Sequence, residues 1–173
     1  MPDIRQRADD APPDMPATVV PGIRYGVLDQ LVGYPVRRAQ LLIYDDFIRS
    51  LVRWGLTPSR FSALVIIANN PGLKLTELSG VLAIARSGSV LLADRLEAAG
   101  LIERRALPTD RRAWGLHLTR AGRSTLEAAS AAVAEHEERM VSVLSADERA
   151  VLKNLLRKLA RIDHAVPPPG QKL

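Results

Sequence analysis

The sequence contains no cysteine, which excludes disulfides, thiolate metal sites, cysteine nucleophiles and thiol redox switches. It also lacks a run of about 18 apolar residues, the length that a membrane-spanning helix needs. The first residues carry charges and prolines where a signal peptide requires an apolar core. We therefore expect a cytoplasmic protein that makes no use of a membrane.

Signatures of catalysis and nucleotide binding are also absent. The sequence has neither a GxGxxG nor a GxxxxGK[ST] phosphate loop, and no GxSxG nucleophile elbow. The histidines have no metal-ligand spacing, and we expect all three at the surface: His117, His136 and His164. Glutamates beside the second one are expected to form a solvated helix face: Glu135, Glu137 and Glu138. Nothing here indicates an enzyme, a metal site or a cofactor.

The composition is that of an ordinary globular protein. The chain has 173 residues, of which 47% are hydrophobic and 25% charged, so it can bury a core without covalent staples. This length fits one domain or two small, closely packed ones. Lysine and arginine exceed the acidic residues by 24 to 19. A modest basic excess fits nucleic acid or an acidic ligand, and the location of the charges decides between them.

Most of the chain has the apolar spacing of helices. Thr57 is a candidate N-cap with Pro58 at the first helical position, and Gly100 follows the last apolar turn of a later helix. Together these signals predict helices over about 28–54, 58–69, 75–82 and 86–99. The third and fourth are joined by a tight turn, which is the pattern of a helix-turn-helix.

After Gly100 the apolar period changes to two. LIERRAL and AWGLHLT flank a polar PTDRR segment, which predicts a β-hairpin and the only pair of strands. A long helix is expected from Thr119 to about residue 143. Another begins at Ser145, where Glu148 completes a capping box. Both helices carry apolar residues at heptad-like spacing, as a dimer interface would: Leu126, Val133 and Met140, then Leu152, Leu159 and Val166.

Four sequence strings, in this order and spacing, resemble the MarR family of winged-helix transcription regulators over about residues 31–162: LTPSRFSALVIIANNPG, RSGSVLLADRLEAAGLIERR, DRRAWGLHLT and TRAGR. The resemblance implies a mainly α fold with a small two-stranded β wing. The winged helix-turn-helix DNA-binding domain would span 57–118, between the two parts of a helical dimerisation region, 23–56 and 119–166. The proline-containing ends, 1–22 and 167–173, are expected to be flexible tails.

The resemblance also implies a homodimer on a palindromic site, with the recognition helix in the major groove and the wing in the minor groove. The segment from Leu101 to Arg123 contains six arginines and only two acidic residues. The basic excess of the chain therefore lies mainly on the wing. Arginine is favoured in a narrow minor groove, and we expect this role for Arg111 and above all Arg112. In the family pattern an acidic residue orients the wing arginine, and Asp110 holds that position.

The segment from residue 86 to 99 is the predicted recognition helix. A period of 3.6 turns one set of side chains inward: Ser89, Leu92, Ala93 and Leu96. The outward set is expected to contact DNA: Arg86, Ser87, Val90, Leu91 and Arg95. For Arg95 a surface ion pair with Asp94 is an equal alternative. Gly88 and the apolar Leu91 depart from the family pattern, so the bases read by each residue are not assigned.

Aromatic residues are scarce, and six of the seven lie before residue 62. We expect Phe47 and Phe61 in the core. The resemblance implies that small aromatic acids bind in this region, where adjacent arginines can engage a carboxylate or coenzyme A phosphates. The candidate ligand-binding residues are Tyr34, Arg37, Arg38 and Tyr44. In the alternative interpretation the tyrosines belong to the core and the arginines are solvated.

The sequence thus predicts a ligand-responsive repressor that a small aromatic acid or its coenzyme A thioester releases from a palindromic operator. Its partners would be double-stranded DNA, a second copy of itself and that anionic ligand. One alternative is a constitutive or architectural DNA-binding protein without an effector. Another is a winged helix that binds proteins, which would not need Arg112 in an exposed hairpin.

Overall fold

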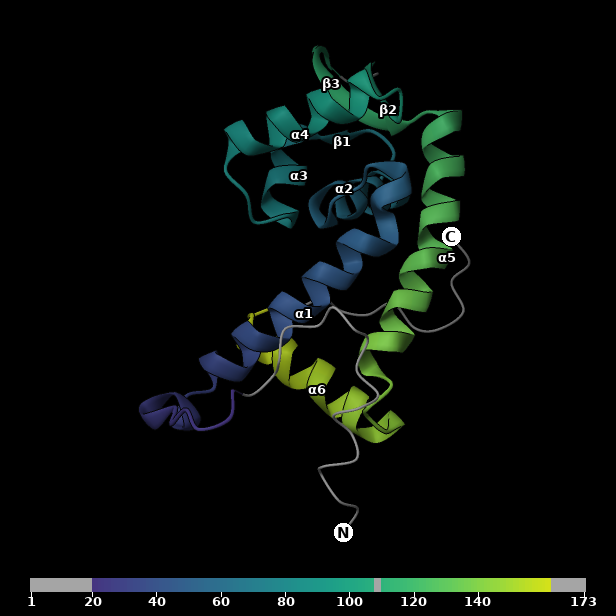
Figure 1. Ribbon diagram of the computed structural model, residues 1–173. Helices are drawn as coiled ribbons and strands as arrows, with labels where there is room; N and C mark the ends of the chain where they lie inside the picture. The colour runs from purple at the N-terminus through teal and green to yellow at the C-terminus, as the bar shows by residue number, and fades with distance from the viewer. Residues whose placement is uncertain (1–19, 108–109, 163–173) are drawn as a thin grey trace. The chain divides into compact units, whose positions relative to one another are not determined.

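The computed structural model describes residues 20–107 and 110–162, and for residues 110–113 the backbone alone (Figure 1). The chain divides between Asp45 and Asp46 into two compact units, and the boundary falls inside a helix. Residues 20–45 form the N-terminal unit and residues 46–162 the C-terminal unit.

The predicted first helix consists of three pieces. A 3₁₀ turn, η2 (Gly26–Gln30), precedes α1 (Gly33–Leu51), and a second 3₁₀ turn, η3 (Val52–Trp54), follows it. Pro35 lies in the first turn of α1, where its missing N–H costs no helical hydrogen bond. Gly55 ends η3 with a φ of +61°, in the left-handed region that glycine tolerates.

The helix-turn-helix is present as predicted. Helix α2 (Pro58–Asn69) begins where the Thr57 hydroxyl accepts a hydrogen bond from the backbone N–H of Arg60 at 3.3 Å. Helices α3 (Leu75–Val81) and α4 (Arg86–Ala98) pack against each other. The hydroxyls of Ser79 and Ser89 lie 2.6 Å apart between them, so the buried Ser89 is satisfied.

The sheet has three strands, one more than expected. Strands β2 (Ile102–Leu107) and β3 (Asp110–Leu118) form the predicted antiparallel hairpin. Strand β1 (Leu73–Lys74) pairs with the other edge of β3, placing Lys74 opposite Gly115. Two residues are too few to show an alternating pattern, so the sequence did not reveal β1. A Cβ at Gly115 would lie 2.7 Å from the Gly72 carbonyl oxygen, so this pairing depends on a glycine.

The core lies in the C-terminal unit, among α2, α3, α4, the sheet and α5. Its largest fully buried side chains are mostly aliphatic: Leu51, Leu64, Ile67, Leu78, Leu96, Ile102 and Leu116. Phe47 and Phe61 pack against it edge to face, with ring centroids 5.8 Å apart. The expectation that these two phenylalanines belong to the core is confirmed.

Helix α5 (Arg120–Val141) is anchored at its start to the beginning of the hairpin. The Thr119 hydroxyl accepts from the N–H of Gly122 at 2.9 Å and donates to the Gly100 carbonyl at 2.6 Å. A Cβ on Gly122 would lie 1.9 Å from the Leu101 carbonyl oxygen, so only glycine fits there. The long helix and the sheet therefore meet with their backbones in close contact.

Helix α6 (Ala146–Leu159) begins with the predicted capping box, in which the Glu148 carboxylate accepts from the backbone N–H of Ser145 at 2.8 Å. An apolar stripe on and just after it is exposed in the single chain: Leu152, Leu155, Leu156, Leu159 and Ile162. In the described part of the chain no single helix is long and apolar enough to cross a membrane. Helices α3 and α4 pass that test only together, across a bend of 111°.

Candidate nucleic-acid interface

Helix α4 has one buried and one exposed face, divided as the sequence predicts. Ser89, Leu92, Ala93 and Leu96 point into the core, and none is more than 8% exposed. The opposite side presents a mixed basic, polar and apolar surface to solvent: Arg86, Ser87, Val90, Leu91 and Arg95. Such a surface has the donors for phosphate and guanine and the apolar groups for thymine methyls.

Arg104 of β2 joins the wing to α4. Its guanidinium contacts Asp94 Oδ1 and Glu97 Oε2, each at 2.5 Å. Asp94 is therefore paired with Arg104, and the alternative of an ion pair between Asp94 and Arg95 is wrong. Within the described residues the side chain of Arg95 makes no hydrogen bond or ion pair. Sequence reasoning missed Arg104, although acidic residues spaced by three on one helix face are a recognisable partner for an arginine.

The wing residues that matter most for the DNA prediction lie on β3. Asp110, Arg111 and Arg112 belong to this strand, but their side chains lie outside the described residues. Their roles therefore stay predictions.

Trp114 stands opposite Ala106 in the hairpin and is 56% exposed. His117 on the same strand is partly exposed, while His164 lies outside the described residues.

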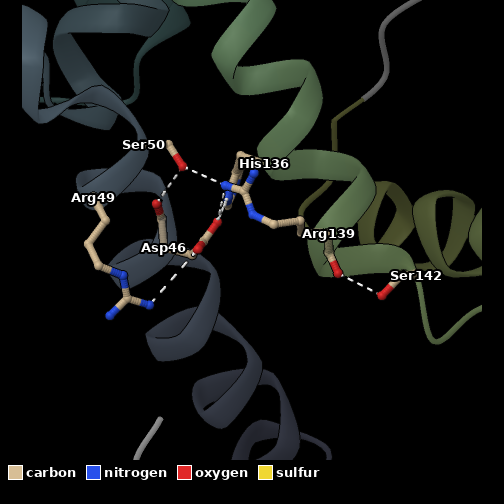
Figure 2. A network of polar contacts seen from close by, with 6 residues as sticks. All are labelled: Asp46, Arg49, Ser50, His136, Arg139 and Ser142. Carbon is tan, nitrogen blue, oxygen red and sulfur yellow. Dashed lines mark hydrogen bonds and ion pairs between the residues drawn. The ribbon is translucent and has the colours of Figure 1, made fainter. Parts of the chain in front are cut away.

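His136 is buried, and its predicted surface position is wrong. It is 2% exposed, and its Nδ1 donates to Asp46 Oδ2 at 2.6 Å (Figure 2). Arg139, one turn later on α5, donates to the same oxygen at 3.0 Å and to Ser50 Oγ at 2.8 Å. His136 lies in the apolar row of α5 at the helical spacing of Ala129, Val133 and Met140. That spacing is the signal by which its burial could have been predicted.

The network lowers the pKa of Asp46. Burial raises the pKa of this carboxyl, but hydrogen bonds and charge from His136 and Arg139 outweigh burial and hold the pKa below its ordinary value. Asp46 thus connects α1 to α5 as a carboxylate. The three glutamates beside His136 are exposed, as expected. Among the described residues no group of three or more His, Asp or Glu side chains forms a metal site.

The predicted ligand residues lie in the N-terminal unit. The rings of Tyr25 and Tyr34 are 5.8 Å apart, and Arg37 donates to Gln40 at 3.2 Å, while Tyr44 is exposed. A hollow of about 550 Å³ in this unit is lined by other residues: Ile23, Arg24, Tyr25, Gly26 and Asp29. The structure brings Tyr34 next to an aromatic partner but places none of the four predicted ligand residues on this hollow.

The helix-turn-helix, the hairpin joined to it and the exposed basic helix face define a winged-helix protein of the DNA-binding class. A sequence model described as the MarR family matches residues 56–114. A candidate transcriptional regulatory protein for the hcr operon of Thauera aromatica is 35% identical over 144 residues, covering 83% of this chain and 87% of that protein. The chain therefore belongs to the MarR family, whose members are dimeric DNA-binding transcriptional regulators.

Two solved structures of one transcriptional repressor, CouR, are also similar. CouR bound to a 23-mer DNA duplex is 40% identical with a TM-score of 0.77, and the match covers 80% of this chain and 99% of CouR. CouR bound to p-coumaroyl-CoA is 38% identical with a TM-score of 0.74, covering 81% and 99%. The mainly α winged-helix fold is thereby confirmed.

Proposed function

We propose that this protein is a cytoplasmic repressor that acts by binding, not catalysis, and that a small aromatic acid or its coenzyme A thioester releases it from a pseudo-palindromic operator. The observation that carries the DNA-binding half is the exposed face of α4, held to the wing by Arg104. In a symmetric dimer two such faces would enter successive major grooves, with half-sites about 10 bp apart.

Each of the five residues predicted to contact DNA from α4 has a proposed role. Arg86 and Arg95 bind guanine or phosphate, and Ser87 binds a phosphate or a base edge. Val90 and Leu91 contact thymine methyls. On the wing, Arg111 and Arg112 bind in or beside the minor groove, where Asp110 orients Arg112.

The test begins by selecting binding sequences for the full protein from a random duplex pool. Arg112→Ala should weaken binding to the selected duplex and lower the slope of log K against log salt by about one unit per wing. Arg86→Ala should change the selected sequence, and Asp110→Ala should give a milder defect than Arg112→Ala. If Arg112→Ala binds like the parent at every salt concentration, the wing does not contact DNA.

Two observations support release by an effector: the similar repressor CouR was solved with p-coumaroyl-CoA, and α1 carries the adjacent arginines Arg37 and Arg38. An aromatic acyl group would bury its ring beside Tyr34 and Tyr44, while Arg37 and Arg38 would bind a carboxylate or the coenzyme A phosphates. The ligand acts only if it binds better to a dimer whose recognition helices are wrongly spaced for DNA.

The effector is tested by changing both arginines, Arg37→Ala and Arg38→Ala, in one variant. DNA affinity should stay near that of the parent, while more p-coumaroyl-CoA or related aromatic thioester is needed to release the duplex. Arg53→Ala, which removes an exposed arginine from η3, serves as the matched control. Loss of DNA binding in the double variant, with no release of the parent by any aromatic acid or thioester, would remove the effector role.

A second candidate function is constitutive DNA binding without an effector. It is favoured by one observation, that none of the four predicted ligand residues lines the hollow of the N-terminal unit. The two candidates differ in thermal denaturation. A ligand that binds the folded dimer raises its melting temperature, whereas a constitutive binder shows no shift with any member of an aromatic acid and thioester panel.

A further inference from the structure

A groove of about 300 Å³ lies in the C-terminal unit between the first turn of α2 and one edge of α4. From α2 it is lined by Ser59 and Arg60, and from α4 by Gly88, Leu91 and Arg95. Leu91 and Arg95 also belong to the exposed face of α4, so the groove continues that face sideways toward α2.

The polar groups of the groove favour an anion. Two guanidinium groups from two different helices line it, and none of its lining residues is acidic. One N–H of the Arg60 guanidinium donates to the Gly55 carbonyl oxygen at 2.7 Å. This hydrogen bond fixes the direction of the guanidinium and leaves its other N–H groups for a partner. Ser59 is exposed and, within the described residues, its hydroxyl makes no hydrogen bond.

No contact within the C-terminal unit explains why residue 88 is a glycine. It lies inside α4, where glycine is less favourable than alanine, and its backbone is ordinary helix. A Cβ built at Gly88 would have no heavy atom of the described residues within 4 Å. Nothing inside this unit therefore requires a bare backbone, whereas a large partner that approaches the helix closely would.

We propose that this groove seats the sugar-phosphate backbone of the DNA strand beside the recognition helix, with Ser59, Arg60 and Arg95 as phosphate ligands and Gly88 as the point of close approach. A helix with its side chains is about 10–12 Å wide and fills a major groove of about 12 Å, so groups beside it meet the flanking backbone. This inference rests on the proposed insertion of α4 and adds α2 as a second contact element.

The first test adds a negative charge to the groove without harming the helix. Ser59→Glu places a carboxylate in the first turn of α2, where acidic residues are favourable, so the fold should keep its stability. Affinity for the duplex selected by the parent should fall about tenfold at low salt, and the loss should shrink as salt rises. Ala146→Glu, which adds the same charge to the first turn of α6 at an exposed position, is the matched control and should bind like the parent.

The second test separates close approach from helix stability. Gly88→Ala should raise the melting temperature of the free protein, because alanine favours the helix and its Cβ meets open space. The affinity of this variant for DNA should nevertheless fall about fivefold or more, because the added methyl group would clash with the sugar-phosphate backbone of the DNA. Gly80→Ala, on exposed α3 surface with the same open space, should raise stability and leave DNA binding unchanged.

The outcomes distinguish the groove from the function on which it rests. If Ser59→Glu and Gly88→Ala bind the selected duplex like the parent, the groove does not contact DNA, while the proposed insertion of α4 stands. If the parent selects no duplex at all, both proposals fail. If Gly88→Ala and Gly80→Ala weaken binding equally, the effect belongs to the fold and the close approach at Gly88 is wrong.

Discussion

At Asp46, charge and stability are directly linked. Its carboxylate accepts hydrogen bonds from His136 and Arg139, which hold its pKa below the ordinary value despite burial. A carboxyl with a lowered pKa in the folded state stabilises the fold above its unfolded pKa of about 3.8. That stabilisation is lost as the pH falls through the folded pKa.

Asp46→Asn removes the charge and keeps the shape. It should lower the free energy of unfolding at pH 7 by about 1–3 kcal/mol, because two hydrogen bonds to a carboxylate are weakened. The difference from the parent should narrow below about pH 4, as the parent carboxyl is protonated. Chemical denaturation at fixed protein concentration measures both effects.

Glu135→Gln is the control for this prediction, since Glu135 is an exposed carboxylate next to His136 in the chain. It should change stability by less than about 0.5 kcal/mol. An Asp46→Asn deficit that is equally large at pH 7 and pH 3 would show that the ionised carboxylate is not the source of the stabilisation.

At the scale of elements, the junction of α5 with the sheet leaves no room for a side chain at Gly122. Gly122→Ala would place a Cβ 1.9 Å from the Leu101 carbonyl oxygen, a backbone atom that cannot move without shifting β2 or α5. We expect a loss of about 1–3 kcal/mol or more in unfolding free energy, in contrast to the gain at Gly80. A melting temperature at or above that of the parent would contradict the described junction.

Secondary elements were predictable where the determining signals are local. The Thr57 and Ser145 caps and the 3.6 period of α4 located helix starts and buried faces, because each signal lies within about one or two turns. What the sequence did not show depends on distant partners. The hydrogen-bond partner of His136 is Asp46, 90 positions earlier, and β1 exists because its two residues pair with β3 beside Gly115.

The same distinction applies to the candidate site. The outward face of α4 followed from periodicity, whereas the pairing of Arg104 with Asp94 and Glu97 required β2 to lie against α4. The groove beside Gly88 needed α2 as well. A binding surface made by one helix is readable from the sequence, while one assembled from two elements requires their packing.

At the scale of the whole molecule, the exposed stripe of α6 predicts how two chains associate. Leu155 and Leu159 are 55% and 64% exposed in the single chain, a costly arrangement unless a partner covers them. Replacing both with lysine should convert the dimer to a monomer of 18.9 kDa. Sedimentation velocity measures the loss of the dimer. The affinity for DNA should fall as well, because a monomer binds only one of the two half-sites.

Asn154→Lys is the control for this dimer prediction, because Asn154 lies on the side of α6 opposite the leucines. That variant should remain a dimer. A double lysine variant that still sediments as a dimer and binds DNA like the parent would place the interface elsewhere.

Helix α5 is attached to its neighbours at two separate points. It is fixed to the sheet at Gly122 and to α1 at His136, 14 residues apart by the sequence numbering, which is about 21 Å along the helix axis. Over that arm a tilt of about 5° moves the far end by about 2 Å. A small rotation of α5 about the contact at Gly122 would therefore displace His136 together with the hydrogen bond that joins it to Asp46 of α1.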